Sequence, residues 1–241
     1  LPTLCAAPAP LLAAGFGDMI AKLTSVADWE LGRLFWDEPY DPVIAARARK
    51  AAWACAHSID ALARRECAGV ETLMAGLIES GLCMLDFGET RPASGYEHHM
   101  SHYLEMKLIW EGRHSVLHGA KVGLGVLASA RLYDQVRRLS RAEVVERLEA
   151  AELPPAVEEI ARIEAAYGQQ AGEIVRLHAP FLDMTQAQFD ALKTRILEQW
   201  PAVQEIAAQV PPADEITGWL NSVGGATTPA QLGLSDQEVA T

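Results

Sequence analysis

The chain has 241 residues, half of them hydrophobic, and a formal net charge of −12 at pH 7. A chain of this size can bury a substantial core, and no linker-like stretch divides it, so we expect a single domain over residues 1–241. The acidic balance argues against nucleic acid or an anionic membrane as a partner, because both require clustered Lys and Arg. Small molecules or other proteins are the expected partners.

The cysteines and the apolar runs indicate the cellular compartment in which the protein is expected. No two Cys have the CxxC spacing, and most lie in apolar helical patterns, where Cys is usually a small buried side chain. The longest run of apolar or small residues, 122–130, is far shorter than the ~20 residues that a membrane span needs. The sequence therefore predicts a cytoplasmic protein that does not enter the membrane.

The first long helix is expected after an Ala-, Pro- and Leu-rich N-terminal stretch. Apolar residues at helical spacing run from Met19 to Leu31, which places Asp18 in the first turn of that helix. An Asp at a helix start normally accepts capping hydrogen bonds or interacts with the helix dipole. The pattern alone therefore leaves both a structural and a functional role for Asp18 open.

Helix signals then continue to the end of the chain. An Asp-Pro pair at residues 41–42 and capping boxes at 140–143 and 185–188 mark helix starts, and apolar residues at helical spacing cover 70–84. Alternating β patterns and internal repeats are absent from the sequence. The sequence therefore predicts an all-α, multi-helix, bundle-like domain with about ten helices.

Five of the seven histidines fall within residues 94–125. His98 and His102 are four residues apart, as are His114 and His118, so each pair shares one helix face if its segment is helical. Imidazole nitrogens on helices are common ligands of transition metals. One such pair is more often part of a solvated polar face, but two pairs around one turn favour a metal site.

The residues around the histidines predict two antiparallel helices. Residues 96–110 contain neither Pro nor Gly, residues 111–113 can turn the chain, and a helical pattern runs from 116 to about 138. Such a hairpin would bring a His of the first pair within reach of His118.

Residues 91–102 (RPASGYEHHMSH) and 117–125 (LHGAKVGLG) resemble the catalytic domain of glycerol-1-phosphate dehydrogenases. These enzymes are relatives of glycerol dehydrogenases, iron-type alcohol dehydrogenases and 3-dehydroquinate synthases. Their metal is held by one acidic residue, by the first His of an HxxxH motif and by a later His that precedes Gly. The resemblance implies His98 and His118 as metal ligands and, through the segment GFGD, Asp18 as the third.

The resemblance also implies roles for other residues near the candidate metal ligands. His102, one helical turn beyond His98, is the candidate for proton relay or substrate contact. Arg91 and Ser94 are candidate substrate contacts in the preceding loop, although a loop Arg is more often simply solvated. Zinc is the expected metal, and nickel or iron would suit the same ligands. The chain departs from the family at Ala120, where Glu often follows His-Gly.

The implied activity is the NAD- or NADP-dependent interconversion of glycerone phosphate and glycerol 1-phosphate, a reaction of phospholipid biosynthesis. The implied fold is the helical C-terminal half of this superfamily, and a homo-oligomer is compatible with it. The family's N-terminal nucleotide-binding α/β domain has no counterpart here, because the Gly-x-Gly of residues 123–125 does not follow a strand. We therefore expect inactivity without that domain. The capping box at 235–238 suggests a chain cut short at its C-terminus.

Two other functions remain open at the level of the sequence. The first is a lyase of the 3-dehydroquinate synthase type, which shares the histidine motifs, although residues 94–97 fit the dehydrogenases better. The second is a non-catalytic helical domain that binds a metal or a protein.

Overall fold

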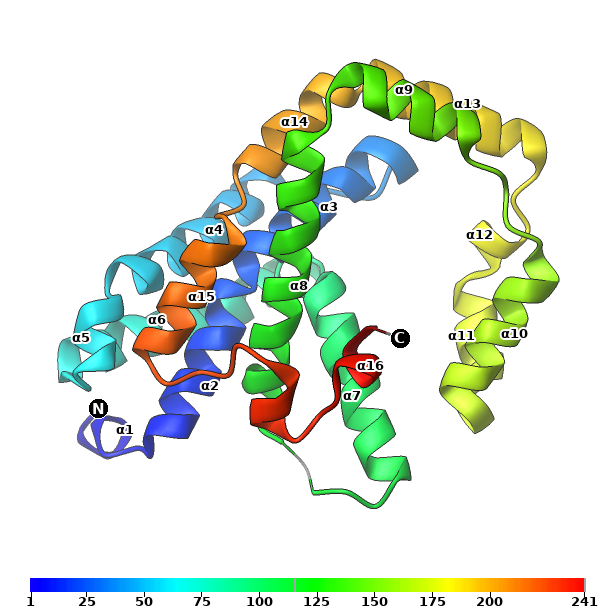
Figure 1. Ribbon diagram of the computed structural model, residues 1–241. Coiled ribbons are helices and arrows are strands. Elements are labelled where there is room, and N and C mark those ends of the chain that lie inside the picture. Colours follow the sequence, from blue (N-terminus) through cyan, green and yellow to red (C-terminus); the bar gives the residue numbers. More distant parts are fainter. Residues whose placement is uncertain (115, 241) are drawn as a thin grey trace. The chain divides into compact units, whose positions relative to one another are not determined.

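The structure, a computed structural model, describes residues 1–114 and 116–240, and these residues form helices and loops with no β-strand among them (Figure 1). The predicted all-α class is therefore confirmed. Two compact units are present: residues 1–138 with 203–240 form the first, and residues 139–202 lie in the second. The single domain expected from the sequence stays a prediction.

The first unit contains the long helices. They and their shorter neighbours are α1 (Pro2–Cys5), α2 (Ala9–Ile20), α3 (Lys22–Trp36), α4 (Pro42–His57), α5 (Ile59–Ala63), α6 (Cys67–Phe87), α7 (Tyr96–Trp110) and α8 (His118–Arg138), then most of α14 (Trp200–Ala208), α15 (Ala213–Ser222), the 3-10 helix η2 (Pro229–Leu232) and α16 (Asp236–Ala240). Figure 1 shows α2 beside α8 in this unit, and α8 also packs along α7.

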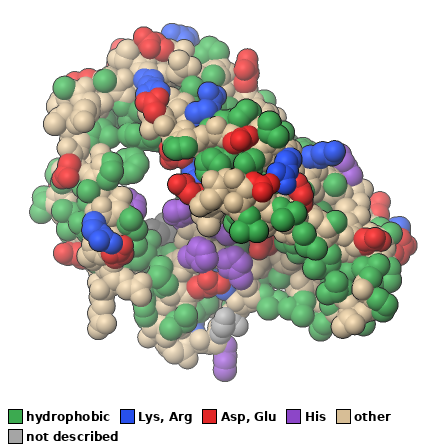
Figure 2. Space-filling view, turned by 180° about the vertical axis from the view of Figure 1, so that it is seen from behind, with side chains coloured by type: hydrophobic (Ala, Val, Ile, Leu, Met, Phe, Trp, Pro, Cys, Tyr) green, Lys and Arg blue, Asp and Glu red, His purple; other side chains and the backbone are tan. Residues whose placement is uncertain are grey.

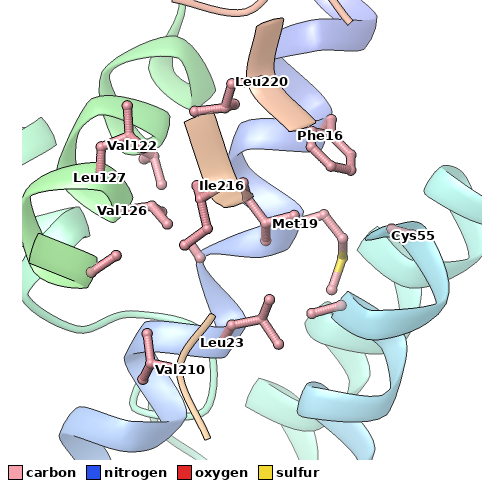
Figure 3. Close-up of a cluster of buried hydrophobic side chains, with 14 of the residues drawn as sticks. Phe16, Met19, Leu23, Cys55, Val122, Val126, Leu127, Val210, Ile216 and Leu220 are labelled. Atoms are coloured by element: carbon pink, nitrogen blue, oxygen red, sulfur yellow. The ribbon is translucent and has the colours of Figure 1, made fainter. Parts of the chain in front are cut away.

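The core of the first unit gathers apolar side chains from α2, α3, α4, α8 and α15 (Figure 3). Its members include Phe16, Met19, Leu23, Cys55, Val122, Val126, Leu127, Val210, Ile216 and Leu220. Burial of such side chains is the main favourable contribution to folding, at roughly 1.5–3 kcal/mol for each large one. A second, smaller cluster between α7 and α8 is centred on Leu104 and Leu124.

The second unit consists of shorter helices. They are α9 (Arg141–Ala150), α10 (Ala156–Tyr167), η1 (Gly168–Gln170), α11 (Ala171–Leu177), α12 (Ala179–Leu182) and α13 (Gln186–Glu198). The two capping boxes predicted within this unit are formed: Ser140 and Thr185 each accept a hydrogen bond from the backbone N–H three residues later. Each cap satisfies a donor that the first helical turn would otherwise leave without a partner.

Helix α6 is the one described helix that is long and apolar enough to cross a membrane by length and composition. The core helix of a soluble protein passes the same test, and α6 packs against α2, α4 and α5. Its inner face buries Val70, Leu73 and Cys83. The helix therefore has a structural role within the first unit.

Two local expectations are wrong. Asp18 lies in the last turn of α2 and not in the first turn of a helix, because α2 already begins at Ala9 and runs through Gly15 and Gly17. His114 does not share a helix with His118: it is exposed in the segment before α8, which begins at His118 itself. The predicted turn at 111–113 is present, with Gly112 at a φ of 63°.

Glycines on α8 bring the backbones of three helices unusually close together. A Cβ on Gly119 would collide with the carbonyl oxygen of Ala14 on α2. A Cβ on Gly125 would lie 2.5 Å from the carbonyl oxygen of Glu97 on α7. Only hydrogen at these positions leaves room for the neighbouring backbone, so the glycines fix how α2, α7 and α8 meet.

We expect Gly119→Ala to destabilise the protein by about 1–3 kcal/mol, because the added methyl must push α2 away from α8. Gly81→Ala on α6 is the matched control, since a Cβ there meets nothing within 4 Å. The control should be neutral or stabilise by up to about 1 kcal/mol, because Ala is the better helix former. Urea unfolding of both variants measures this, and equal stability would contradict the packing role of Gly119.

Candidate metal centre

Three side chains from three helices converge where α2, α7 and α8 meet. Asp18, His98 and His118 each offer one ligand atom, and these atoms all lie within 4.8 Å of one another. The Nε2 atom of His98 is 3.5 Å from Oδ1 of Asp18, and the ring centroids of His98 and His118 are 5.5 Å apart. Figure 2 shows histidine side chains gathered on one face of the molecule.

Asp18 is held in place by a buried lysine. Lys22, one helical turn further on and only 3% exposed, places its Nζ 2.5 Å from Oδ1 of Asp18. Burial alone would raise the pKa of Asp18, but contact with His98 and the charge of Lys22 lower it well below its usual range. The carboxylate is therefore ionised at neutral pH, as a metal ligand must be.

His98 lies between two carboxylates. Glu97, which is completely buried, places Oε1 2.9 Å from Nδ1 of His98, and Asp18 faces the Nε2 side. Burial lowers the pKa of His98, but the two carboxylates outweigh it and raise the pKa above its usual value. A metal ion at this place would compete with protons for His98, so the metal affinity should depend on pH.

His118 is anchored by a different carboxylate. Its Nδ1 lies 3.0 Å from Oε1 of Glu105 and 3.4 Å from Oγ of Ser101, both on α7. The same oxygen of Glu105 lies 3.2 Å from Nζ of Lys121, whose side chain is completely buried. Because Nδ1 is engaged in this way, Nε2 is the nitrogen of His118 that is left for a metal ion.

His102 projects from the same face of α7 as His98, as the four-residue spacing predicts. Its ring centroid is 6.2 Å from that of His98 and 5.2 Å from that of His118. Its side chain is 56% exposed, and Nδ1 lies 3.2 Å from Oε2 of Glu105. His102 is therefore the solvent-facing member of the cluster, and its catalytic role stays a prediction.

The two predicted substrate contacts, Arg91 and Ser94, lie in the loop before α7. Arg91 pairs with Oε2 of Glu38 through Nε and Nη2, at 2.8 and 2.6 Å, so the chain itself engages its guanidinium. Ser94 is partly exposed, two residues before α7 begins. Substrate binding by Arg91 and Ser94 stays a prediction.

The carboxylates of buried Glu97 and half-buried Asp28 occupy N–H groups at the start of α7. Glu97 accepts from the backbone N of Gly95 at 2.9 Å, and Asp28 of α3 accepts from the N of Tyr96 at 2.8 Å and from the hydroxyl of Tyr133 at 2.6 Å. Burial, together with the charge of Glu97, raises the pKa of Asp28 to about 6 despite these hydrogen bonds. The chain therefore fixes the start of α7, and with it His98, from within.

The carboxylates and lysines around the ligands were not identified from the sequence. Glu105 follows His98 by seven residues, a spacing that returns to the same helix face, so this signal could have found it. Lys22 and Lys121 carried no such signal, because a Lys on a helix is usually solvated and only the tertiary structure buries these two.

Comparison with known proteins points to one family of enzymes. The chain is 49% identical to a glycerol-1-phosphate dehydrogenase (NAD(P)+) of Bacillus licheniformis over 133 residues, which are 55% of this chain and 33% of that protein. It is 32% identical to the enzyme of the same name from Geobacillus stearothermophilus over 236 residues, 98% of this chain and 49% of that protein. The Bacillus subtilis enzyme of this name is 45% identical over 141 residues, 58% of this chain and 35% of that protein.

These matches differ in how much of each protein they cover. The Geobacillus match extends over nearly the whole chain, yet the chain spans only about half the length of that relative. No protein-family model matches the chain.

The pKa of Asp28 predicts how stability depends on pH. Since the folded state holds this proton up to a pH of about 6, against 3.8 for an ordinary Asp, ionisation costs stability as the pH rises through this window. Asp28→Asn removes that cost. The difference in unfolding free energy, wild type minus Asp28→Asn, should therefore decrease by about 2–3 kcal/mol as the pH rises from 4 to 7. Urea unfolding in EDTA measures it, and parallel pH profiles would contradict it.

Proposed function

Since this chain is homologous to the glycerol-1-phosphate dehydrogenases over most of its length, we propose that it is the metal-binding catalytic part of an NAD(P)-dependent polyol-phosphate dehydrogenase. The reaction would interconvert glycerone phosphate and glycerol 1-phosphate by hydride transfer in the cytoplasm. The observation that carries the proposal is the convergence of Asp18, His98 and His118 in a chain related to these enzymes. The names of the relatives favour this reaction over that of a 3-dehydroquinate synthase.

The donor set suits a divalent transition metal. One carboxylate and two imidazoles are a common set of protein ligands for zinc in catalytic sites, where they leave positions open for the substrate, and nickel or iron accept the same ligands. When bound, the metal would polarise the substrate carbonyl and stabilise negative charge on its oxygen. Asp18 and the Nε2 atoms of His98 and His118 would hold it.

The remaining residues of the cluster have their own tasks in this proposal. Glu105 engages Nδ1 of His102, which leaves Nε2 of that half-exposed ring to exchange a proton with the substrate oxygen. Lys22 keeps Asp18 ionised and oriented. Ser94 would contact the substrate at the start of α7, and Arg91 would do so if its pair with Glu38 opens.

Binding of the nicotinamide cofactor would require a nucleotide-binding domain. The printed names of the relatives include NAD(P)+, and the matches cover only 33% and 49% of those proteins. We propose that a nucleotide-binding domain outside these 241 residues binds most of the cofactor. The polyol phosphate would then lie between that domain and the histidine cluster.

We expect the purified protein to bind about one divalent metal ion and His118→Ala to lose it, because one of three ligands is removed. His114→Ala is the matched control, since His114 is exposed and lies outside the cluster. Elemental analysis after dialysis measures the metal content. Equal metal content in the two variants would remove His118 from the site.

In the full-length enzyme, His98→Ala should lose metal and activity together. His102→Ala should keep the metal and lose turnover by something on the order of 10²-fold, because His102 is proposed to move a proton and not to bind the metal. His99→Ala, at the exposed neighbouring position, serves as the control. Unchanged turnover in His102→Ala would leave that residue without a catalytic role.

A further inference from the structure

We propose that Glu105 is a positioning residue for the metal centre, and that it fixes the ring of His118 so that Nε2 faces the metal ion. This inference rests on the proposed metal site. It extends that site by a fourth side chain that does not bind the metal.

The contacts of Glu105 determine which nitrogen of His118 carries the proton. An ionised carboxylate can only accept hydrogen bonds, so Nδ1 of His118, at 3.0 Å from Oε1, must be the protonated nitrogen of the neutral ring. The lone pair is then on Nε2. The carboxylate thereby sets the tautomer and the rotation of the ring before any metal arrives.

Glu105 is itself held from two sides. Nζ of the completely buried Lys121 lies 3.2 Å from Oε1, and the same ammonium group donates to the carbonyl oxygen of Val116. Nδ1 of His102 lies 3.2 Å from the other oxygen, Oε2. A carboxylate anchored to both α7 and α8 in this way has little freedom to rotate away from His118.

The same arrangement occurs at the other imidazole ligand. Glu97 places Oε1 2.9 Å from Nδ1 of His98, and its Oε2 accepts from the hydroxyl of Thr24 at 2.9 Å. Each proposed histidine ligand therefore has its own carboxylate on Nδ1. This repetition indicates that the contact of Glu105 is part of the site and is not an incidental surface ion pair.

A second metal ion is the main alternative, because His102, Glu105 and His118 also offer ligand atoms within 4.8 Å of one another. The buried ammonium group of Lys121 argues against it, since a cation next to Glu105 would repel another one. A second ion would also require Nδ1 of His118, which the contact with Glu105 already uses. Positioning is therefore the better explanation of the cluster.

The test compares Glu105→Gln with Glu111→Gln. Glu111 follows the end of α7, and its partners are Lys107 and Arg113, so the control removes an acidic charge that is paired with cations outside the cluster. Competition with a chelator measures the affinity of both variants for zinc. The absorption spectrum of the cobalt-loaded protein reports ligand geometry, which a merely structural role would not change.

Glu105→Gln should bind zinc 10- to 100-fold more weakly than the wild type, the usual effect of removing such a partner of a ligand, and its cobalt spectrum should change. Glu111→Gln should stay within about twofold of the wild type. Zinc affinity and a cobalt spectrum equal to those of the wild type in Glu105→Gln would overturn the proposal. Binding of a second zinc ion by the wild type that Glu105→Gln abolishes would overturn it as well.

Two further measurements keep the test decisive. If the wild type binds zinc and His118→Ala does not, the metal site stands, and a null result for Glu105→Gln refutes the positioning role alone. If Glu105→Gln does not fold because Lys121 loses its partner, Glu105→Gln combined with Lys121→Met removes that unpaired charge. The same loss of affinity is expected in the double variant, and an unchanged affinity would overturn the proposal.

Discussion

The rest of the site depends on the close contact of three helix backbones. Gly119 lets α8 rest on the backbone of α2 at Ala14, and Gly125 lets it rest on α7 at Glu97. His98 and His118 are next to these contacts in the sequence, and Asp18 follows Gly17, which also packs against Gly119. The packing that closes the core therefore also sets the distances between the candidate ligands. Small residues on one helix thus have a functional consequence, although they carry no functional group.

The buried charges around the ligands follow from the same packing. Lys22 and Lys121 each pair with a carboxylate of the cluster, and an unpaired charge at such depth would cost several kcal/mol. Glu97 and Glu105 each meet Nδ1 of a proposed ligand. The chain therefore holds the site in one arrangement through its own ion pairs and hydrogen bonds.

The sequence predicted those features that depend on local chemistry. Helix α7, its shared His98 and His102 face and the capping boxes follow from spacing and from residue type, and the structure confirms them. The prediction that a helix starts near Asp18 was wrong because Gly15 and Gly17 suggest a break in the helix. In the structure, α2 continues through them, since its packing against α8 requires a small residue. The spacing of Glu105 from His98 could have identified that residue, but the roles of Lys22 and Lys121 depend on tertiary contacts that no spacing rule encodes.

Metal binding by Asp18, His98 and His118 is tested most directly by the X-ray absorption spectrum of the zinc-loaded protein. We expect a first shell of nitrogen and oxygen at about 2.0–2.1 Å, with the multiple-scattering signature of about two imidazoles and with one carboxylate oxygen. A shell with one imidazole or none, or one that contains sulfur, would contradict binding by Asp18, His98 and His118.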